Sequence, residues 1–351
     1  MRFASKLVHS LILGTFITAM TCITAIPMVA AQASASAAVP TGISPSASIF
    51  SLSPADADAA LAGIARAGAT WVRLDIAWYA AEPSPGSWSW TDTDRVIGAA
   101  LKHHLKVDAI LAYAPKWAFT AGQPDPLAFA QFASAAVSRY GAAGVDTWEV
   151  WNEENMGWAW PIVSPDAFGA LLKEGYRAIH AAQPGATVLV GGLGRSPDSL
   201  PSGETASSFM STLLADGYGA YMDAVGFHPY TYSDWPDSPP RAGEPGYRNG
   251  MAEMTRVHDL LSKYGRGDTK FWITEFGSPT SHDGDAQTPQ AQSDMITRAY
   301  NRFSGYSWAG PFFVFTWRDD SSQGFGLLDG NGARKPSYGA FEAISGVAHS
   351  P

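Results

Sequence analysis

Two short segments of this chain place acidic side chains directly after an apolar run. Residues 148–155 read Trp-Glu-Val-Trp-Asn-Glu-Glu-Asn, and residues 271–277 read Phe-Trp-Ile-Thr-Glu-Phe-Gly. Each acid on its own could be a solvated cap at a strand end. As a pair, Glu153 and Glu275 could cleave a glycosidic bond, because that reaction needs one acid to protonate the leaving oxygen and one carboxylate to attack the anomeric carbon.

Short apolar runs alternate with helical patterns and supply the elements that must bring these acids together. Strands are expected at Ile43, 71–76, 107–113, 147–151, 187–191, 224–227, 271–275 and 312–316. Helices are expected to begin near Pro54, Asp92, Pro126, Pro165, Glu204, Tyr247, Pro289 and Ser337. This alternation, with a repeat of roughly 35–40 residues, predicts the α/β class and a single (β/α)8 TIM barrel.

The spacing of the two acids fits this barrel. Glu153 and Glu275 are 122 residues apart, which corresponds to three units of about 40 residues each. We therefore expect them at the ends of strands four and seven. Connections from helix to strand are short, whereas connections from strand to helix are long, so the active face is expected at the carboxyl ends of the strands.

Five motifs resemble clan A glycoside hydrolases, and they look most like family 39, with the cellulase-like enzymes of family 5 next. The motifs are Trp-Val-Arg-Leu-Asp at 71–75, Ala-Pro-Lys-Trp-Ala at 114–118, Asn-Glu at 152–153, His-Pro-Tyr at 228–230 and Thr-Glu-Phe-Gly at 274–277. The resemblance runs from about Thr41 to Val347. It implies a glycosidase hydrolysing O-glycosyl compounds, which cleaves a β-linked poly- or oligosaccharide with retention by double displacement.

The resemblance assigns the chemistry to the Asn-Glu and Thr-Glu motifs. It implies that Glu153 is the general acid/base, that Glu275 is the nucleophile, and that Asn152 binds the sugar 2-hydroxyl. The family usually has Pro after its acid/base, whereas this sequence has Glu154 there, so either glutamate could do this work. The Asn-Glu match favours Glu153. Alternation along the strand would put Glu153 and Asn152 on opposite sides.

Two polar residues are expected to act on the nucleophile. By the same resemblance, Arg73 would hold Glu275 ionised through its fixed positive charge. Arg73 could instead pair simply with Asp75 or Glu149. Tyr230 would donate a hydrogen bond to Glu275 and position it.

Imidazole and aromatic side chains complete the expected substrate site. His228 would form a polar wall of the subsite, or else be a satisfied core histidine. Trp317, expected to end strand eight, would be the floor under the sugar and would be followed by a cis peptide to Arg318; the alternative is that it belongs to the core. Aromatic residues of the long loops would stack on further sugar units. These are Tyr113, Trp117, Trp158, Trp160 and Trp235.

The N-terminal segment resembles a secretory signal. Arg2 and Lys6 precede an apolar run over about 7–31 and then a stretch of small residues, which is the order typical of an export signal. A retained membrane anchor is the alternative. The expected organisation is a signal over 1–33, a short linker over 34–40 and a catalytic domain over 41–348, secreted and without stable membrane insertion.

Composition excludes other classes of function. The net charge is −9 and there is no basic run, so binding of nucleic acid is not expected. The only cysteine, Cys22, falls in the expected signal. The proposed chemistry requires no metal or cofactor, and we expect a monomer. The alternative function is a non-catalytic carbohydrate-binding barrel associated with the cell wall, which would keep the aromatic cleft and need neither acid.

Overall fold

The computed structural model describes residues 38–198, 202–232, 234–239, 248–281, 285–319 and 323–347. The expected signal over 1–33 and the first part of the expected linker lie outside these ranges, so both stay predictions. Among the described residues, no helix combines the length and the apolar character that crossing a membrane requires.

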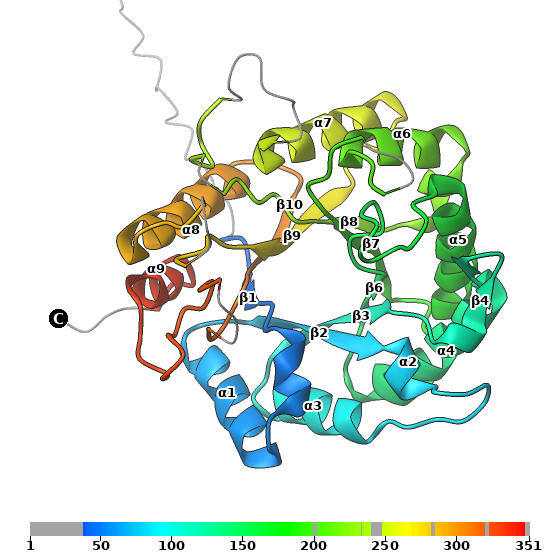
Figure 1. Ribbon diagram of the computed structural model, residues 1–351, viewed down its shortest axis with the longest axis horizontal. Helices are drawn as coiled ribbons and strands as arrows, with labels where there is room; N and C mark the ends of the chain where they lie inside the picture. Colours follow the sequence, from blue (N-terminus) through cyan, green and yellow to red (C-terminus); the bar gives the residue numbers. More distant parts are fainter. Residues whose placement is uncertain are drawn as a thin grey trace, which may run out of the picture. The chain divides into compact units, whose positions relative to one another are not determined.

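Parallel strands close into a barrel in which each strand pairs with its neighbour in chain order and the last strand pairs with the first (Figure 1). The barrel strands are β1 Thr41–Ile43, β2 Trp71–Ala77, β3 Lys106–Ala112, β6 Thr147–Val150, β7 Thr187–Leu193, β8 Ala224–Phe227, β9 Lys270–Phe276 and β10 Ala309–Val314. The predicted TIM barrel is confirmed. β6 and β9 are its fourth and seventh strands, as the spacing of the two acids indicated.

Helices surround this barrel (Figure 1). They are α1 Pro54–Arg66, α2 Trp78–Ala81, α3 Thr91–Lys102, α4 Pro126–Tyr140, α5 Pro165–Ala182, α6 Ala206–Ala215, α7 Gly250–Lys263, α8 Pro289–Ser304 and α9 Pro336–Ile344, with 3-10 turns η1 Ala47–Ser51, η2 Lys116–Ala118, η3 Gly141–Ala143 and η4 Tyr218–Tyr221. Two features were not expected from the sequence. One is the short helix α2, and the other is a hairpin of β4 Phe119–Thr120 and β5 Gln123–Pro124.

Side-chain caps set the starts of the long helices. Ser53, Asp125 and Ser164 each accept a hydrogen bond from a first-turn backbone N–H, and Pro follows each of them. Pro suits this position because its missing N–H would have no helical partner there. Thr205 and Asn249 cap α6 and α7 in the same way, so these helices begin slightly later than the sequence suggested.

A buried aromatic cluster fills the lower part of the barrel. Its members come from strands on opposite sides of the ring and are Trp71, Leu189, Ala224, Trp272 and Phe313. The rings of Trp71 and Trp272 meet edge to face with centroids 5.0 Å apart. Because side chains alternate along a strand, Arg73 and Asp75 follow Trp71 up the inner face of β2. The aromatic cluster therefore supports a polar layer above it.

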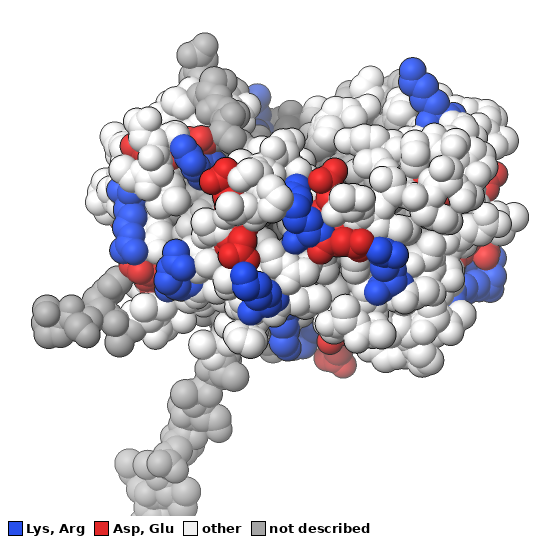
Figure 2. Space-filling view, turned by 90° about the horizontal axis from the view of Figure 1, so that it is seen from below, with Lys and Arg blue, Asp and Glu red and all other residues white. Residues whose placement is uncertain are grey.

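Charged side chains of both signs are mixed on the face of the molecule shown in Figure 2, among a larger area of other residues. This distribution gives that face no continuous field of one sign.

Candidate active site

A cavity of about 520 Å³ opens at the carboxyl ends of the barrel strands. Each of the eight strands contributes a lining residue near its end or just after it, namely Ser44, Asp75, Tyr113, Glu153, Arg195, Tyr230, Glu275 and Phe315. This is the face on which TIM barrels carry their active sites, and the volume is that of a small-molecule site. The cavity is therefore the candidate active site.

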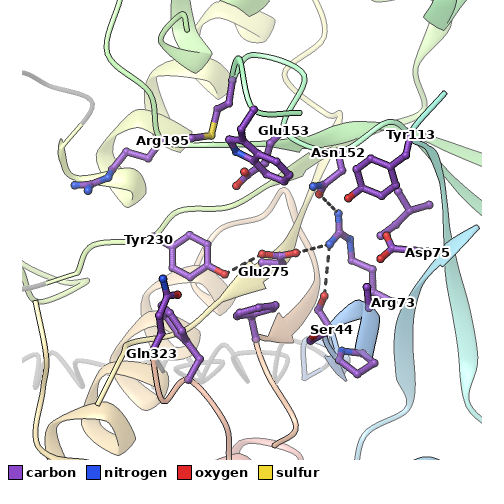
Figure 3. Close-up of a pocket in the computed structure, with 18 of the residues that line it drawn as sticks. Ser44, Arg73, Asp75, Tyr113, Asn152, Glu153, Arg195, Tyr230, Glu275 and Gln323 are labelled. Carbon is purple, nitrogen blue, oxygen red and sulfur yellow. Dashed lines mark hydrogen bonds and ion pairs between the residues drawn. The ribbon is translucent and has the colours of Figure 1, made fainter. Parts of the chain in front are cut away.

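Glu275 is held by donors on both of its carboxylate oxygens (Figure 3). Arg73 Nη1 donates to Oε1 at 2.6 Å, and the Tyr230 hydroxyl donates to Oε2 at 2.9 Å. His228 Nδ1 lies 3.6 Å from Oε2. Burial alone would raise the pKa of Glu275, but His228, Arg73 and Tyr230 outweigh burial and bring that pKa below its usual value. The carboxylate is thus kept ionised.

Arg73 connects Glu275 to the buried polar residues beneath it. Its Nε and Nη2 form a two-point contact with Glu149, at 2.7 and 3.0 Å, and Nη2 also donates to Asn152 Oδ1 at 2.7 Å. Arg73 and Glu149 are both almost completely buried. The two roles considered for Arg73, pairing with Glu149 and holding Glu275, are therefore present together, and its fork geometry explains how one side chain serves both.

Glu153 faces the same cavity from the end of β6. Its Oε1 lies 2.8 Å from His228 Nδ1, so the two acids approach the same ring nitrogen. Glu275 Oε2 lies 3.6 Å from the same nitrogen, so the distance between Glu153 Oε1 and Glu275 Oε2 is at most the sum of 2.8 and 3.6 Å. His228 is itself fully buried and does not line the cavity. The expected polar wall is wrong, because the imidazole is buried against Glu153 and Glu275 and leaves no surface in the cavity.

An irregular backbone directs the side chains after β6. Trp151 has φ 71° and Glu153 has φ 50°, a region that costs a non-glycine residue on the order of 1 kcal/mol or more. Trp151 turns outward and packs on Trp160, while Asn152 and Glu153 both line the cavity. The expectation that Asn152 and Glu153 lie on opposite sides is therefore wrong, since the strand has ended and alternation no longer applies.

Glu154 does not reach the cavity. Its side chain is fully buried, and no described residue forms a hydrogen bond with either carboxylate oxygen. Burial raises the pKa of Glu154 well above its ordinary value of 4.5. Of the two adjacent glutamates, only Glu153 can contact a substrate in the cavity.

Glycines at the end of β7 make room for these acidic and imidazole groups. A Cβ on Gly192 would lie 2.0 Å from His228 Nε2, and one on Gly194 would lie 2.9 Å from Glu153 Oε1. Any side chain at either position would displace His228 or Glu153. This packing explains why glycine occupies positions 192 and 194 of the Gly-Gly-Leu-Gly run at 191–194.

Trp317 does not form the floor of the candidate site. It packs on Tyr338, with ring centroids 5.8 Å apart, and against Gly63 of α1, and it faces a separate cavity of about 720 Å³. The reason is that β10 ends at Val314, so Phe315 takes the position at the barrel mouth. The cis peptide expected after Trp317 lies instead between Phe315 and Thr316.

Few of the loop aromatics line the cavity. Tyr113 and Trp158 do, and Trp158 is 63% exposed. Trp117 instead donates its indole N–H to the Glu82 carbonyl and packs on Trp78. Trp160 is fully buried, and Trp235 lies under the guanidinium of Arg298 at 4.2 Å. Trp117, Trp160 and Trp235 therefore stabilise the loops and are not placed for substrate stacking.

Sequence reasoning missed Phe315 and considered Glu149 and Asp75 only as alternative partners of Arg73. Glu149 anchors Arg73, Phe315 replaces Trp317 at the mouth, and Asp75 lines the cavity as a third carboxylate. Alternation from Arg73 would have found Asp75, because both share the inner face of β2. Phe315 carried no such signal, since its place depends on where β10 ends.

Within the described residues, no group of three or more His, Cys, Asp or Glu side chains is arranged to hold a metal ion. Glu275, Asn152 and Glu153 are engaged with Arg73, Tyr230 and His228.

No family model matches the sequence, and no curated protein does. Among solved structures, a family 39 glycoside hydrolase from Bacteroides cellulosilyticus WH2 aligns with a TM-score of 0.68 at 24% identity, covering 88% of this chain and 64% of that one. A monomeric β-xylosidase from Caulobacter crescentus CB15 aligns with a TM-score of 0.66 at 20% identity, covering 87% of this chain and 67% of that one.

A third solved structure comes from family 5, subfamily 18. This protein of Bifidobacterium longum subsp. longum, in complex with Manβ1-4GlcNAc, has a TM-score of 0.65 at 14% identity and covers 88% of this chain and 78% of that one. The similar structures thus include families 39 and 5, the two that the sequence motifs resemble. At these identities the likeness is one of fold. The chain spans less than two thirds of the length of the Bacteroides protein.

Proposed function

We propose that this chain is a retaining β-glycosidase that cleaves a β-linked poly- or oligosaccharide, with Glu275 as nucleophile and Glu153 as general acid/base. The observation that carries the proposal is that two glutamates face one cavity and that their carboxylates have different hydrogen-bond partners. Glu275 accepts hydrogen bonds from Arg73 and Tyr230, whereas the one hydrogen bond of the Glu153 carboxylate among the described residues is with the imidazole of His228. The Glu275 carboxylate is thus held as an anion, and the Glu153 carboxylate faces the same cavity.

In the first step, a carboxylate oxygen of Glu275 attacks the anomeric carbon while Glu153 gives its proton to the departing glycosidic oxygen. The bond from the anomeric carbon to that oxygen breaks, and an ester between sugar and Glu275 forms. In the second step, Glu153 takes a proton from water, the water oxygen attacks the anomeric carbon, and Glu275 leaves as a carboxylate. Two inversions give net retention.

Arg73 and Asn152 stabilise the charges and hydroxyl groups involved in both steps. Arg73 stays charged throughout and stabilises the carboxylate that leaves in the second step. Because Asn152 Oδ1 already accepts from Arg73, its amide nitrogen is left to donate to the sugar 2-hydroxyl. Glu153 Oε1 and Glu275 Oε2 lie 2.8 and 3.6 Å from the same His228 nitrogen, so both carboxylates can reach one anomeric carbon.

The stereochemistry of the first product tests this proposal. The purified protein is incubated with 4-nitrophenyl β-glycosides of xylose, glucose, galactose and mannose, and the anomer released first is read by proton NMR before it mutarotates. We expect the β-anomer from the substrate that is cleaved. Release of the α-anomer would indicate inversion and contradict the assignment of Glu275 as nucleophile. No cleavage of these glycosides or of any β-glycan would favour a carbohydrate-binding barrel.

We also propose that the protein is exported and acts as a monomer. The basic start and apolar run of residues 1–33 support export, and the similar Caulobacter enzyme is described as monomeric. Mass spectrometry and light scattering of protein recovered from the culture medium check both points. A chain that retains residues 1–33, or a particle of twice the chain mass, would contradict them.

A further inference from the structure

A third carboxylate, Asp75, lines the cavity, and the mechanism above does not use it. Figure 3 shows it beside Tyr113, on the side of the cavity away from Tyr230. Its side chain is partly exposed, and no described residue donates a hydrogen bond to it. The donors of nearby Arg73 are directed elsewhere, to Ser44, Glu149, Asn152 and Glu275.

A half-buried carboxylate without donors is unfavourable unless a ligand supplies them. Burial raises the pKa of Asp75 to about 6, with Arg73 opposing the rise and the charges of Glu275 and Glu149 adding to it. Above that pH the side chain is an anion whose two oxygens accept about four hydrogen bonds. Two neighbouring sugar hydroxyls present donors at a matching separation.

The rest of the site indicates which edge of the sugar faces Asp75. In the proposed mechanism the anomeric carbon lies between Glu153 and Glu275, and the 2-hydroxyl faces Asn152. In the view of Figure 3, Asn152 lies on the Glu153 side of Arg73 and Asp75 lies on the Tyr113 side. Asp75 therefore meets the ring positions beyond C2, which carry the 3- and 4-hydroxyls.

We propose that Asp75 is a specificity-determining residue whose carboxylate accepts hydrogen bonds from the 3- or 4-hydroxyl of the sugar that Glu275 attacks. The negative charge at this edge selects a neutral sugar with a free hydroxyl there and rejects a uronic acid by charge repulsion. This inference rests on the proposed function and adds the class of sugar to it.

A double-mutant cycle between protein and substrate tests this contact. The substrates are the 4-nitrophenyl β-glycoside that is cleaved fastest and its 3-deoxy and 4-deoxy analogues, and the variant is Asp75→Ala. We expect kcat/KM on the parent sugar to fall about 10- to 100-fold, as for loss of a hydrogen bond to a charged group. On the analogue that lacks the bound hydroxyl, the variant and the unaltered protein should differ less than about 3-fold.

The matched control is Asp92→Asn, which neutralises an acid that is 73% exposed on α3 and should leave every kcat/KM unchanged. Equal losses on the parent and both analogues would mean that Asp75 is structural, and no loss on the parent would mean that it does not contact the sugar. Either result overturns the inference while leaving the proposed function intact. A protein that cleaves no β-glycoside overturns both.

The pH profile gives a second readout. The groups around Asp75 are Arg73 on its own strand, Tyr113 after β3, Glu149 on β6 and Glu275 on β9. Because Asp75 loses its charge as the pH falls through about 6, kcat/KM of the unaltered protein should decline there, mainly through KM. In Asp75→Asn that decline should move to lower pH, where Glu275 titrates. An unchanged acid limb would contradict the role of Asp75.

Discussion

Replacing Glu275 by Gln is expected to lower kcat by about 10⁴- to 10⁶-fold, the scale of loss seen when a covalent nucleophile is removed. The amide has nearly the same shape, and Arg73 keeps its two-point contact with Glu149, so the fold should persist. The loss should appear in kcat and kcat/KM alike, because the ester cannot form. Hydrolysis of a 4-nitrophenyl β-glycoside, with thermal unfolding measured in parallel, checks the result.

An added anion distinguishes a lost nucleophile from general damage. In Glu275→Ala the cavity gains space on the face from which Glu275 attacks, so azide can enter there and displace the leaving group directly. The expected product is the α-glycosyl azide, with one inversion. A β-glycosyl azide, or kcat reduced less than about 10-fold in Glu275→Gln, would show that another residue forms the covalent bond.

The sequence predicted best which barrel strand carries each acidic residue. Apolar runs and a constant spacing placed Glu153 and Glu275 on strands four and seven, because a parallel barrel repeats one unit and its period survives in the chain. The ion pair between Arg73 on β2 and Glu275 on β9 was expected from the family resemblance, and the structure contains it.

Predictions were wrong where the chain leaves the strands. Phe315 rather than Trp317 reaches the mouth because β10 ends at Val314, and an apolar run does not reveal its last paired residue. Asn152 turns to the cavity because Trp151 has a positive φ, which no periodicity predicts. Such departures concentrate at the active face, where the backbone must aim several side chains at one point.

Replacing Glu153 by Ala is expected to have an effect that depends on the leaving group. With a sugar leaving group that must be protonated, kcat/KM should fall about 10²- to 10⁴-fold, the usual contribution of general acid catalysis. With 2,4-dinitrophenolate, which leaves without a proton, kcat/KM should change less than about 10-fold.

Loss of the base in Glu153→Ala then slows the second step, so the glycosyl-enzyme accumulates, and mass spectrometry of the quenched reaction should detect it. Azide should accelerate turnover and give the β-glycosyl azide.

The neighbouring Glu154 provides the matched control for this test. Glu154→Gln should keep kcat/KM within about 3-fold on both leaving groups, because Glu154 is fully buried outside the cavity.

The effect of Glu154→Gln should be on stability. Burial raises the pKa of Glu154 well above 4.5, so at pH values between 4.5 and the raised pKa the folded state keeps a proton that the unfolded state releases. The free energy of unfolding therefore decreases as the pH rises from 4.5 towards the raised pKa. Glu154→Gln removes this decrease, so urea unfolding at pH 5, 6.5 and 8 should show the variant gaining up to about 1.4 kcal/mol per pH unit. If Glu154→Gln instead reproduced the leaving-group dependence and Glu153→Ala did not, the acid/base would be Glu154 and the cavity geometry would have misassigned it.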